Sequence, residues 1–521
     1  MIRSLSRMLA RMLFAASLIG GVATLQAAPS SQVAWQVAAN DADVERAFAT
    51  ARAERKPVLL YWGATWCPPC NQLKATLFNR QDFAAAARSF VAVHVDGDQP
   101  GAQKLGTRFQ VSGYPSVVLF SADGTEITRL PGEVEPEQMM AVLQLGMAGG
   151  RPVKAVLADA RAGKALSGGE WRMLAFYSWD TDEQQLVPRS EQPGLLVELA
   201  AAAPASDPDT STRLWLKALA ASNDGQGVRP DAALRARVER VLADPATARR
   251  HADLLSNHAD DIVRAFDSEA TPQRAAMVAA FDTALQRLQA DATLSRGDRL
   301  GAVIARLALA RLDLPKDSVH VTLPAALRAE LQARVAADDR EIRDGYERQA
   351  VITSAAYALG LAGLWDQSNA LLKANLTRSH SPYYLMSQLG GNARKLGRTD
   401  EALDWYEQAW RKSVGPATRL QWGSSYLAAL VDLAPQQARR VEQTAAALIA
   451  DAGKDSGAFE GRSVRSLQRM SKKLAAWNEL GEHEAALKRL KAQLDAVCGK
   501  TEAGSSARAT CRGLLGTGAA A

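Results

Sequence analysis

Two cysteines separated by two prolines, Cys67-Pro68-Pro69-Cys70, have the spacing of a reactive dithiol. The apolar run at 57–63 predicts a buried strand just before them, and a helix is predicted to follow. At the start of a helix, backbone N–H groups and the helix dipole stabilise a thiolate, so Cys67 is the expected nucleophile. Cys70, one turn along, can attack the mixed disulfide that Cys67 forms. The prolines are tolerated because the first turn of a helix needs no internal N–H bonds.

The stretch around the motif alternates between strand-like and helix-like runs, which favours an α/β domain with a central sheet over residues 33–148. Helices are predicted at 41–55, 71–77 and 135–145, and strands at 57–63, 90–95, 116–120 and 126–130. The last two strands enclose Asp123-Gly124 and are expected to form a hairpin. A short linker is predicted at 149–169.

Trp66 directly precedes Cys67, and Gly113-Tyr114-Pro115 follows later in the chain, just before the predicted hairpin. Together with the buried strand and the cysteine motif, this order of features resembles thioredoxin over about a fifth of the chain. The resemblance implies a thioredoxin-like fold that exchanges a dithiol with the disulfides of protein substrates, without a cofactor. It also implies that Pro115 is a cis-proline facing the cysteines, that the Tyr114 backbone pairs with an extended substrate chain, and that Trp66 shields the pair.

The chain departs from cytosolic thioredoxin at a position that matters for proton transfer. Where that protein has a buried aspartate six residues before its nucleophile, this chain has Tyr61, and the usual lysine partner aligns with Ala92. Water, Tyr61 and His94 are the candidates for the proton acceptor of Cys70. The surrounding segment looks more like the exported, interchange-type members, so a membrane electron-transfer partner is expected. No histidine lies between the cysteines, which favours a reductase or isomerase role.

Three other interpretations of the Cys67 and Cys70 pair stay open at this point. The pair could form a purely structural disulfide. It could bind a metal, most plausibly copper, although the six histidines are scattered and no metal site is expected. Finally, the thioredoxin-like domain could be a passive docking module of an envelope scaffold whose helical surface does the main work.

The first 28 residues have the order of a secretory signal peptide, with three arginines, an apolar run at 12–25 and the small residues Ala27 and Ala28. The run is shorter than the roughly 20 residues that span a bilayer, so we expect an exported, periplasmic protein without a stable membrane span. An uncleaved anchor is the alternative, because Leu25 is not the small residue that cleavage after Ala27 favours. The net charge of +6 is not concentrated in one block, so no nucleic-acid partner is expected.

Residues 170–521 are predicted to form an all-α domain of helical hairpins, because alanine, leucine, arginine and glutamine recur there at helical spacing. Two segments beginning at Gly363 and Gly397 align at a spacing of 34 residues, and a looser third copy begins at Leu480-Gly481. A glycine, a charged turn and then small and aromatic residues resemble tetratricopeptide repeats. An irregular bundle of hairpins is the alternative. We expect this domain to recruit partners or to protect the cysteines.

The remaining two cysteines, Cys498 and Cys511, lie in a tail rich in glycine, serine and alanine. Cysteines that leave the cytosol tend to be paired or catalytic. This pair lacks the tight spacing and the flanking aromatic residues of the first, so it is predicted to be a structural disulfide.

Overall fold

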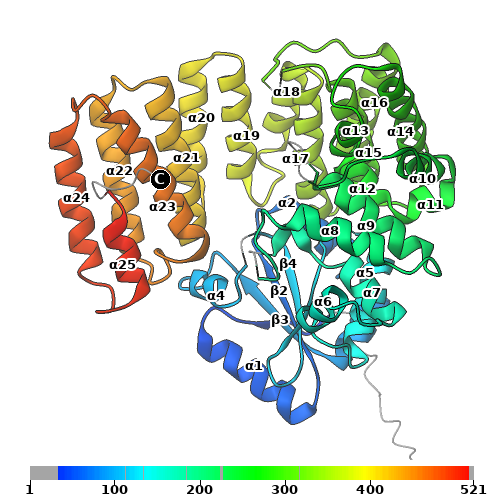
Figure 1. Cartoon of the computed structure of the whole chain (residues 1–521). Helices are drawn as coiled ribbons and strands as arrows, with labels where there is room; N and C mark the ends of the chain where they lie inside the picture. The colour runs from blue at the N-terminus through cyan, green and yellow to red at the C-terminus, as the bar shows by residue number, and fades with distance from the viewer. Residues whose placement is uncertain are drawn as a thin grey trace, which may run out of the picture.

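The computed structural model describes residues 33–515 apart from positions 112, 133, 183–184, 223–226 and 316. The predicted signal peptide at 1–28 lies outside the described residues. An α/β domain at one end of the molecule is covered by an all-helical region (Figure 1). The predicted fold class, a thioredoxin-like domain followed by helical hairpins, is confirmed. Among the described helices, none is both long and apolar enough to cross a membrane.

The α/β domain contains a sheet of five strands in the order β1-β3-β2-β4-β5. The strands are β1 (Gln36–Val37), β2 (Val58–Gly63), β3 (Val91–Asp96), β4 (Ser116–Phe120) and β5 (Glu126–Leu130). Strands β1, β3 and β2 run parallel, whereas β4 and β5 are antiparallel to their neighbours and form the predicted hairpin. The two-residue β1 was not predicted, because so short a strand has no periodicity to detect.

Helices cover both faces of this sheet. They are α1 (Asp41–Glu54), α2 (Pro68–Ala75), α3 (Gln81–Ala86), α4 (Gln103–Arg108) and α5 (Pro136–Met147), with a 3₁₀ turn η1 (Ala87–Ser89). Successive residues of β2 point to opposite faces. Leu60 and Trp62 pack in one apolar cluster with α1, while Leu59 and Tyr61 pack in another with α2 and α5. Since β2 is buried along its whole length, it fixes the start of α2 rigidly at the edge of the sheet.

The rest of the chain is helical. Its helices are α6 (Val153–Arg161), α7 (Gly168–Ala175), η2 (Trp179–Thr181), α8 (Gln192–Ala202), α9 (Pro208–Ala220), α10 (Ala232–Ala243), α11 (Pro245–Arg250), α12 (Ala252–Asn257), α13 (Ala259–Phe266), α14 (Pro272–Ala290), α15 (Arg296–Ala310), α16 (Ala325–Glu341), α17 (Gly345–Leu361), α18 (Trp365–Asn375), α19 (Pro382–Lys395), α20 (Thr399–Lys412), α21 (Pro416–Leu433), α22 (Ala438–Ala452), α23 (Gly461–Trp477), α24 (Glu484–Cys498) and α25 (Ser506–Gly513). Helix α6 lies inside the predicted linker at 149–169. We call helices α8 to α25 the helical region.

Three glycines that mark the predicted repeats lie in turns between helices. Gly363, Gly397 and Gly481 have φ angles of +73°, +71° and +76°, which strain any residue with a Cβ atom. They separate α17 from α18, α19 from α20 and α23 from α24. The turns are therefore where the glycines predicted them, while the tetratricopeptide assignment stays a prediction.

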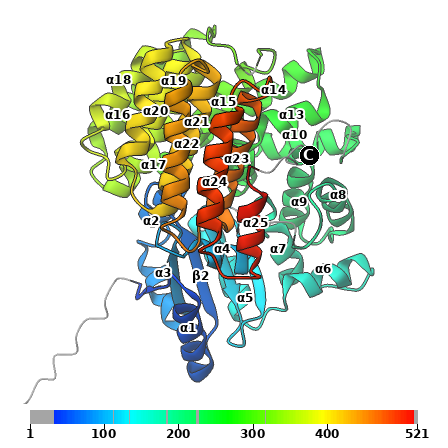
Figure 2. The same ribbon diagram turned by 90° about the vertical axis from the view of Figure 1, so that its left-hand side faces the viewer.

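The helical region curves over the α/β domain (Figures 1 and 2). Helices α17 to α19 lie above the start of α2, with α20 to α25 on one side of them and α8 to α16 on the other. Helix α17 packs against α2, and α23 packs against α4. One apolar cluster runs from the sheet through α19, α21 and α23 as far as Cys498 and Cys511. These two cysteines form a disulfide, are fully buried, and join α24 to α25.

Removing the Cys498–Cys511 disulfide should lower the stability of the C-terminal helices. In the chain-entropy model, a disulfide that closes a loop of this length contributes about 3 kcal/mol. We therefore expect a Cys498→Ala, Cys511→Ala variant to have a lower Tm than wild type, measured from the helical circular-dichroism signal. An identical melting curve for the two proteins would contradict a structural role for this disulfide.

Candidate functional site

The cysteine motif follows β2 and forms the start of α2. Cys67 is the N-cap of α2, and its Sγ accepts a hydrogen bond from the backbone N–H of Cys70 at 3.2 Å. The two cysteines form a disulfide, with their Cα atoms 5.2 Å apart. Pro68 and Pro69 occupy the first turn of the helix, which begins earlier than the predicted 71–77. A thiolate at Cys67 would therefore meet a backbone N–H and the positive end of a helix dipole.

Asn71 holds the loop before the motif. Its side-chain amide donates hydrogen bonds to the carbonyl oxygens of Thr65 at 2.9 Å and Cys67 at 2.8 Å. The residue is completely buried. It fixes the path of the backbone on both sides of Trp66. Sequence reasoning missed this role, although a polar residue directly after the motif was visible.

The predicted Tyr114 and Pro115 lie on the second segment of the site. The peptide bond between them is cis. Pro115 packs so closely on Gly132 that a Cβ atom there would approach the proline ring to 2.8 Å. The Tyr114 ring meets the Trp66 ring edge to face, with centroids 6.0 Å apart. The structure thus brings the two predicted segments, the cysteine motif and the cis-proline turn, together.

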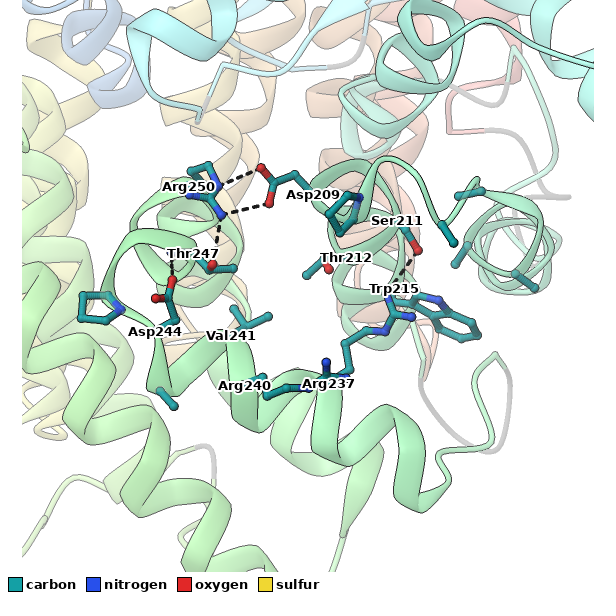
Figure 3. A pocket seen from close by; sticks show the side chains of 17 residues that line it. Asp209, Ser211, Thr212, Trp215, Arg237, Arg240, Val241, Asp244, Thr247 and Arg250 are labelled. Atoms are coloured by element: carbon teal, nitrogen blue, oxygen red, sulfur yellow. Dashed lines mark hydrogen bonds and ion pairs between the residues drawn. The ribbon is translucent and has the colours of Figure 1, made fainter.

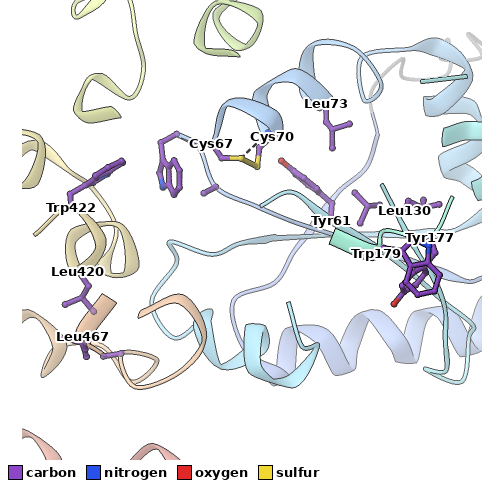
Figure 4. Packing of buried hydrophobic residues seen from close by; sticks show 14 of the residues in the cluster. Tyr61, Cys67, Cys70, Leu73, Leu130, Tyr177, Trp179, Leu420, Trp422 and Leu467 are labelled. Carbon is purple, nitrogen blue, oxygen red and sulfur yellow. Dashed lines mark hydrogen bonds between the residues drawn. A yellow bond between two sulfur atoms is a disulfide. The ribbon is translucent and has the colours of Figure 1, made fainter. Parts of the chain in front are cut away.

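The two cysteines are closed to solvent, whereas Pro69 between them is exposed. Cys67 is 2% exposed, Cys70 0% and Trp66 6%. The Trp66 ring stacks on Tyr384 of α19, with centroids 5.8 Å apart, and meets Trp422 of α21 edge to face. Figure 4 shows Trp422 on the side of the motif where Cys67 lies. Trp66 therefore lies between the motif and the helices α19 and α21, and its shielding of the pair stays a prediction.

A cation completes this aromatic cluster. The guanidinium carbon of Arg462, at the start of α23, lies 5.0 Å from the ring centroids of both Trp66 and Tyr114. Burial lowers the pKa of Arg462. Its backbone N–H donates to the side chain of Gln103, the first residue of α4, and Gln103 in turn donates to the Tyr114 hydroxyl at 3.0 Å. The start of α23 is therefore fastened to the cis-proline side of the site.

Polar contacts fasten the same tryptophan to α21. The Trp66 indole N–H donates to Asp98 Oδ2 at 3.0 Å and to Thr418 Oγ1 at 2.7 Å. The Thr418 backbone N–H donates to Asp98 Oδ1 at 2.9 Å. Burial raises the pKa of Asp98 to about 6, against the lowering effect of these donors. Gly415, with a φ of +89°, allows the close approach, since a Cβ atom there would lie 2.6 Å from Asp98 Cβ.

Two further hydrogen bonds reach the backbone of the motif loop from the helical region. The Gln349 side-chain amide of α17 donates to the carbonyl oxygen of Trp66 at 3.4 Å. His380 Nε2 lies 3.1 Å from the carbonyl oxygen of Thr65. Helices α17, α19, α21 and α23 therefore all contribute a side chain or a cap to the same loop.

The candidates for proton transfer lie on the opposite side of the pair. Tyr61 stacks on His94, with ring centroids 4.9 Å apart. The Tyr61 hydroxyl is directed toward the disulfide (Figure 4) and has no hydrogen-bond partner among the described residues. Burial raises the pKa of Tyr61 and, with the nearby Lys74, lowers the pKa of His94 to about 4, so that His94 is neutral at pH 7. Burial also raises the pKa of Asp96.

Asp96 and Asp98 were not predicted as site residues. Asp96 is the last residue of β3 and Asp98 follows it, at the edge of the sheet where the motif also lies. Their position at the end of a buried parallel strand was therefore a usable signal. The contacts from Thr418, Tyr384 and Trp422 left no comparable signal, because they join segments more than 300 residues apart.

Of two hollows in the protein surface, only one lies beside the cysteine motif. One, of ≈ 1120 Å³, lies between helices α8, α9, α10 and α11 (Figure 3). Its Arg250 pairs with Asp209, and none of the motif residues lines it. The other, a crevice of ≈ 170 Å³, is lined by Pro68 and Pro69 on one side and by helices α15 and α17 on the other. Within the described part of the chain, no group of three or more His, Cys, Asp or Glu side chains could hold a metal ion.

Comparison with known proteins agrees with this geometry. A family model described as a thioredoxin-like domain matches residues 44–146. The thioredoxin-like protein slr0233 of Synechocystis sp. is 31% identical over 90 residues, which cover 17% of this chain and 81% of that protein. The region that the family model matches contains strands β2 to β5 and the cysteine motif.

Larger relatives match a segment of similar length. The thiol:disulfide interchange protein DsbD 2 of Pseudomonas aeruginosa is 31% identical over 116 residues, or 22% of this chain and 20% of the relative. The protein DsbD of Ralstonia nicotianae is 30% identical over 125 residues, or 23% of this chain and 21% of the relative. The match thus spans about a fifth of the length of each of these relatives, and most of this chain lies outside it.

The unpartnered hydroxyl of Tyr61 leads to a stability prediction. Removing a buried hydroxyl that makes no hydrogen bond leaves no partner unsatisfied, so Tyr61→Phe should keep or raise the Tm. The matched control is Tyr177→Phe, because the equally buried Tyr177 hydroxyl donates to Asp182 at 2.8 Å. We expect that control to lose about 1 to 2 kcal/mol of unfolding free energy. Equal losses in both variants would mean that Tyr61 has a partner.

Proposed function

The chain belongs to the thioredoxin-like family, and on that premise we propose that it is an exported thiol–disulfide oxidoreductase acting on protein substrates. The observation that carries the proposal is the Cys67–Cys70 disulfide at the start of α2, where a thiolate would be stabilised. The names of the larger relatives, thiol:disulfide interchange proteins, point to the same class of reaction.

In the proposed reaction, the Cys67 thiolate attacks one sulfur of a substrate disulfide. The substrate S–S bond breaks, a Cys67–substrate bond forms, and the released substrate sulfur takes up a proton. Cys70 then loses its proton and attacks Cys67 Sγ, which frees the second substrate thiol and closes the Cys67–Cys70 bond. Two electrons have passed from the protein dithiol to the substrate.

The supporting residues have separate roles in this proposal. Pro68 and Pro69 start α2, which keeps the backbone N–H of Cys70 aimed at Cys67 Sγ. Tyr114 and Pro115 form the turn against which an extended substrate chain pairs. For the proton of Cys70, water, Tyr61 and His94 stay the candidates. The Tyr61 hydroxyl points toward the disulfide, but its raised pKa keeps it protonated, so it could only relay the proton onward. His94 is neutral and can accept a proton, although its low pKa makes it a weak base.

The direction of electron flow and the partners are inferred from the sequence. The motif has no histidine between its cysteines, which favours a reductase or isomerase over an oxidant. A reductase must be reduced again after each turnover, so we propose a membrane electron-transfer partner for the exported protein. The signal-like order of residues 1–28 supports a periplasmic location.

Burial of both sulfurs favours a second candidate function. A dithiol that substrates cannot reach would serve as a structural part of a scaffold whose helical region binds partners. In that case, a Cys67→Ser, Cys70→Ser variant would still perform in the cell.

The reduction potential of the Cys67 and Cys70 pair tests the proposed direction. We expect a value near the roughly −270 mV of thioredoxin, measured by equilibration with glutathione, rather than near the roughly −120 mV of strong oxidants. Insulin reduction should be abolished in Cys67→Ser, because the nucleophile is missing, and Cys70→Ser should accumulate a mixed disulfide. The Cys498→Ala, Cys511→Ala variant is the matched control and should keep the wild-type potential. If the Cys67 and Cys70 pair never exchanges with glutathione or insulin, the scaffold becomes the function that we infer.

A further inference from the structure

A second contact between the α/β domain and the helical region lies across the crevice from Pro68 and Pro69. The Gln72 side-chain amide of α2 donates to Ser295 Oγ at 2.6 Å, and Ser295 Oγ donates to Asp298 Oδ2 at 2.5 Å. Asp298, on α15, in turn shares a hydrogen bond with Glu135, which directly precedes α5 of the α/β domain. Two carboxyl groups that are hydrogen bonded to one another must share a proton.

Few charges surround this pair. Arg249 of α11 lies 3.1 Å from Glu135 and is shared with Asp291, at 3.0 Å. The crevice residues next to Asp298 from α2, α12 and α17 are uncharged, namely Gln72, Asn257 and Ser354. When both carboxyl groups of the pair are ionised, one arginine faces three carboxylates. The contact then holds an excess of negative charge in a partly buried place.

Burial and the neighbouring carboxylate raise the pKa of Glu135 to about 7 despite Arg249, and burial raises the pKa of Asp298. A raised pKa in the closed state means that the closed state binds the proton more tightly than the open state does. This stabilisation of the closed state is complete at pH values below the ordinary pKa range of carboxyl groups, and it is lost as the pH rises through about 7. Asp98, with its pKa of about 6 at the Trp66 contact, acts in the same direction.

We propose that the helical region is a cap on the Cys67–Cys70 site, held closed by the proton shared between Glu135 and Asp298, and that the site opens to substrates as this pair ionises. The regulation is that of the proposed oxidoreductase function, on which this inference rests. In the closed state, Trp66 occupies the cluster formed by Tyr384, Trp422 and Arg462, and the crevice beside Pro68 is roofed by α15 and α17. An extended substrate chain needs both contacts to separate.

The test is the rate at which a phosphine, tris(2-carboxyethyl)phosphine, reduces the Cys67–Cys70 disulfide of the full-length protein at pH 5.0 and pH 7.5. Each rate is divided by the rate on oxidised glutathione at the same pH, which removes the pH dependence of the reductant. Because each unit of pKa shift is a tenfold change in the opening equilibrium, we expect the normalised rate to rise about tenfold or more. Both rates should lie well below the rate on oxidised glutathione.

Asp298→Asn identifies the shared proton as the cause. Its amide can donate to Glu135 without adding a charge, so the normalised reduction rate at pH 7.5 divided by that at pH 5.0 should fall several-fold. The pH dependence that remains in this variant is the part due to Asp98. Glu135→Gln should lower the same ratio, and it replaces Asp298→Asn in the test if that variant folds poorly. The matched control is Glu137→Gln, because Glu137 is 80% exposed and lies two residues from Glu135; it should keep the wild-type ratio. Trp422→Ala should speed reduction at both pH values.

A wild-type disulfide that reacts as fast as oxidised glutathione at both pH values would overturn the cap. A ratio unchanged in both Asp298→Asn and Glu135→Gln would overturn the role of the shared proton. The phosphine reports access and needs no turnover, so the two proposals can fail separately. A pair that opens as expected but never exchanges with insulin would overturn the oxidoreductase function alone.

Discussion

Burial of the Trp66 side chain is the interaction on which the arrangement of the two parts of the molecule depends. The ring lies between α19 and α21, and its indole N–H donates to Thr418, which is 352 residues away in the chain. Burying a side chain of this size contributes roughly 3 kcal/mol, provided that its N–H finds a partner. Asp98 and Thr418 supply that partner, and the adjacent Cys67 is closed to solvent as a consequence.

The contacts between the two parts of the molecule are more polar than a permanent interface requires. Asp98, Glu135 and Asp298 are carboxyl groups at the junction, and burial raises the pKa of each. An interface that only held the parts together would gain more from apolar residues of similar volume. Buried acids instead make the closed arrangement depend on protons and reduce its stability at neutral pH. Interfaces between domains that move resemble this mixture of an aromatic anchor and polar surroundings.

Much of the α/β domain could be predicted because its signals are local. The apolar run of β2, the spacing of Cys67 and Cys70 and the Asp123-Gly124 turn each act over a few residues. Residues such as Thr418 could not be predicted, because their role comes from a contact with Trp66 that exists only after the helical region has folded over the motif. Asp98 is an intermediate case, since its place after β3 was visible but its partner was not.

The apolar core shows why the boundary between the parts is hard to place. The predicted boundary between 169 and 170 falls inside α7, which begins at Gly168 after a capping box formed by Ser167 and Glu170. Trp171 and Leu174 of this helix belong to the same cluster as Leu59 of the sheet. A cut there would expose apolar surface that the sheet domain needs to have covered. A truncated chain would lose both the helices that cover the motif and part of the apolar core of the sheet. The role of the helical region therefore has to be tested by point substitutions at its contacts and not by its removal.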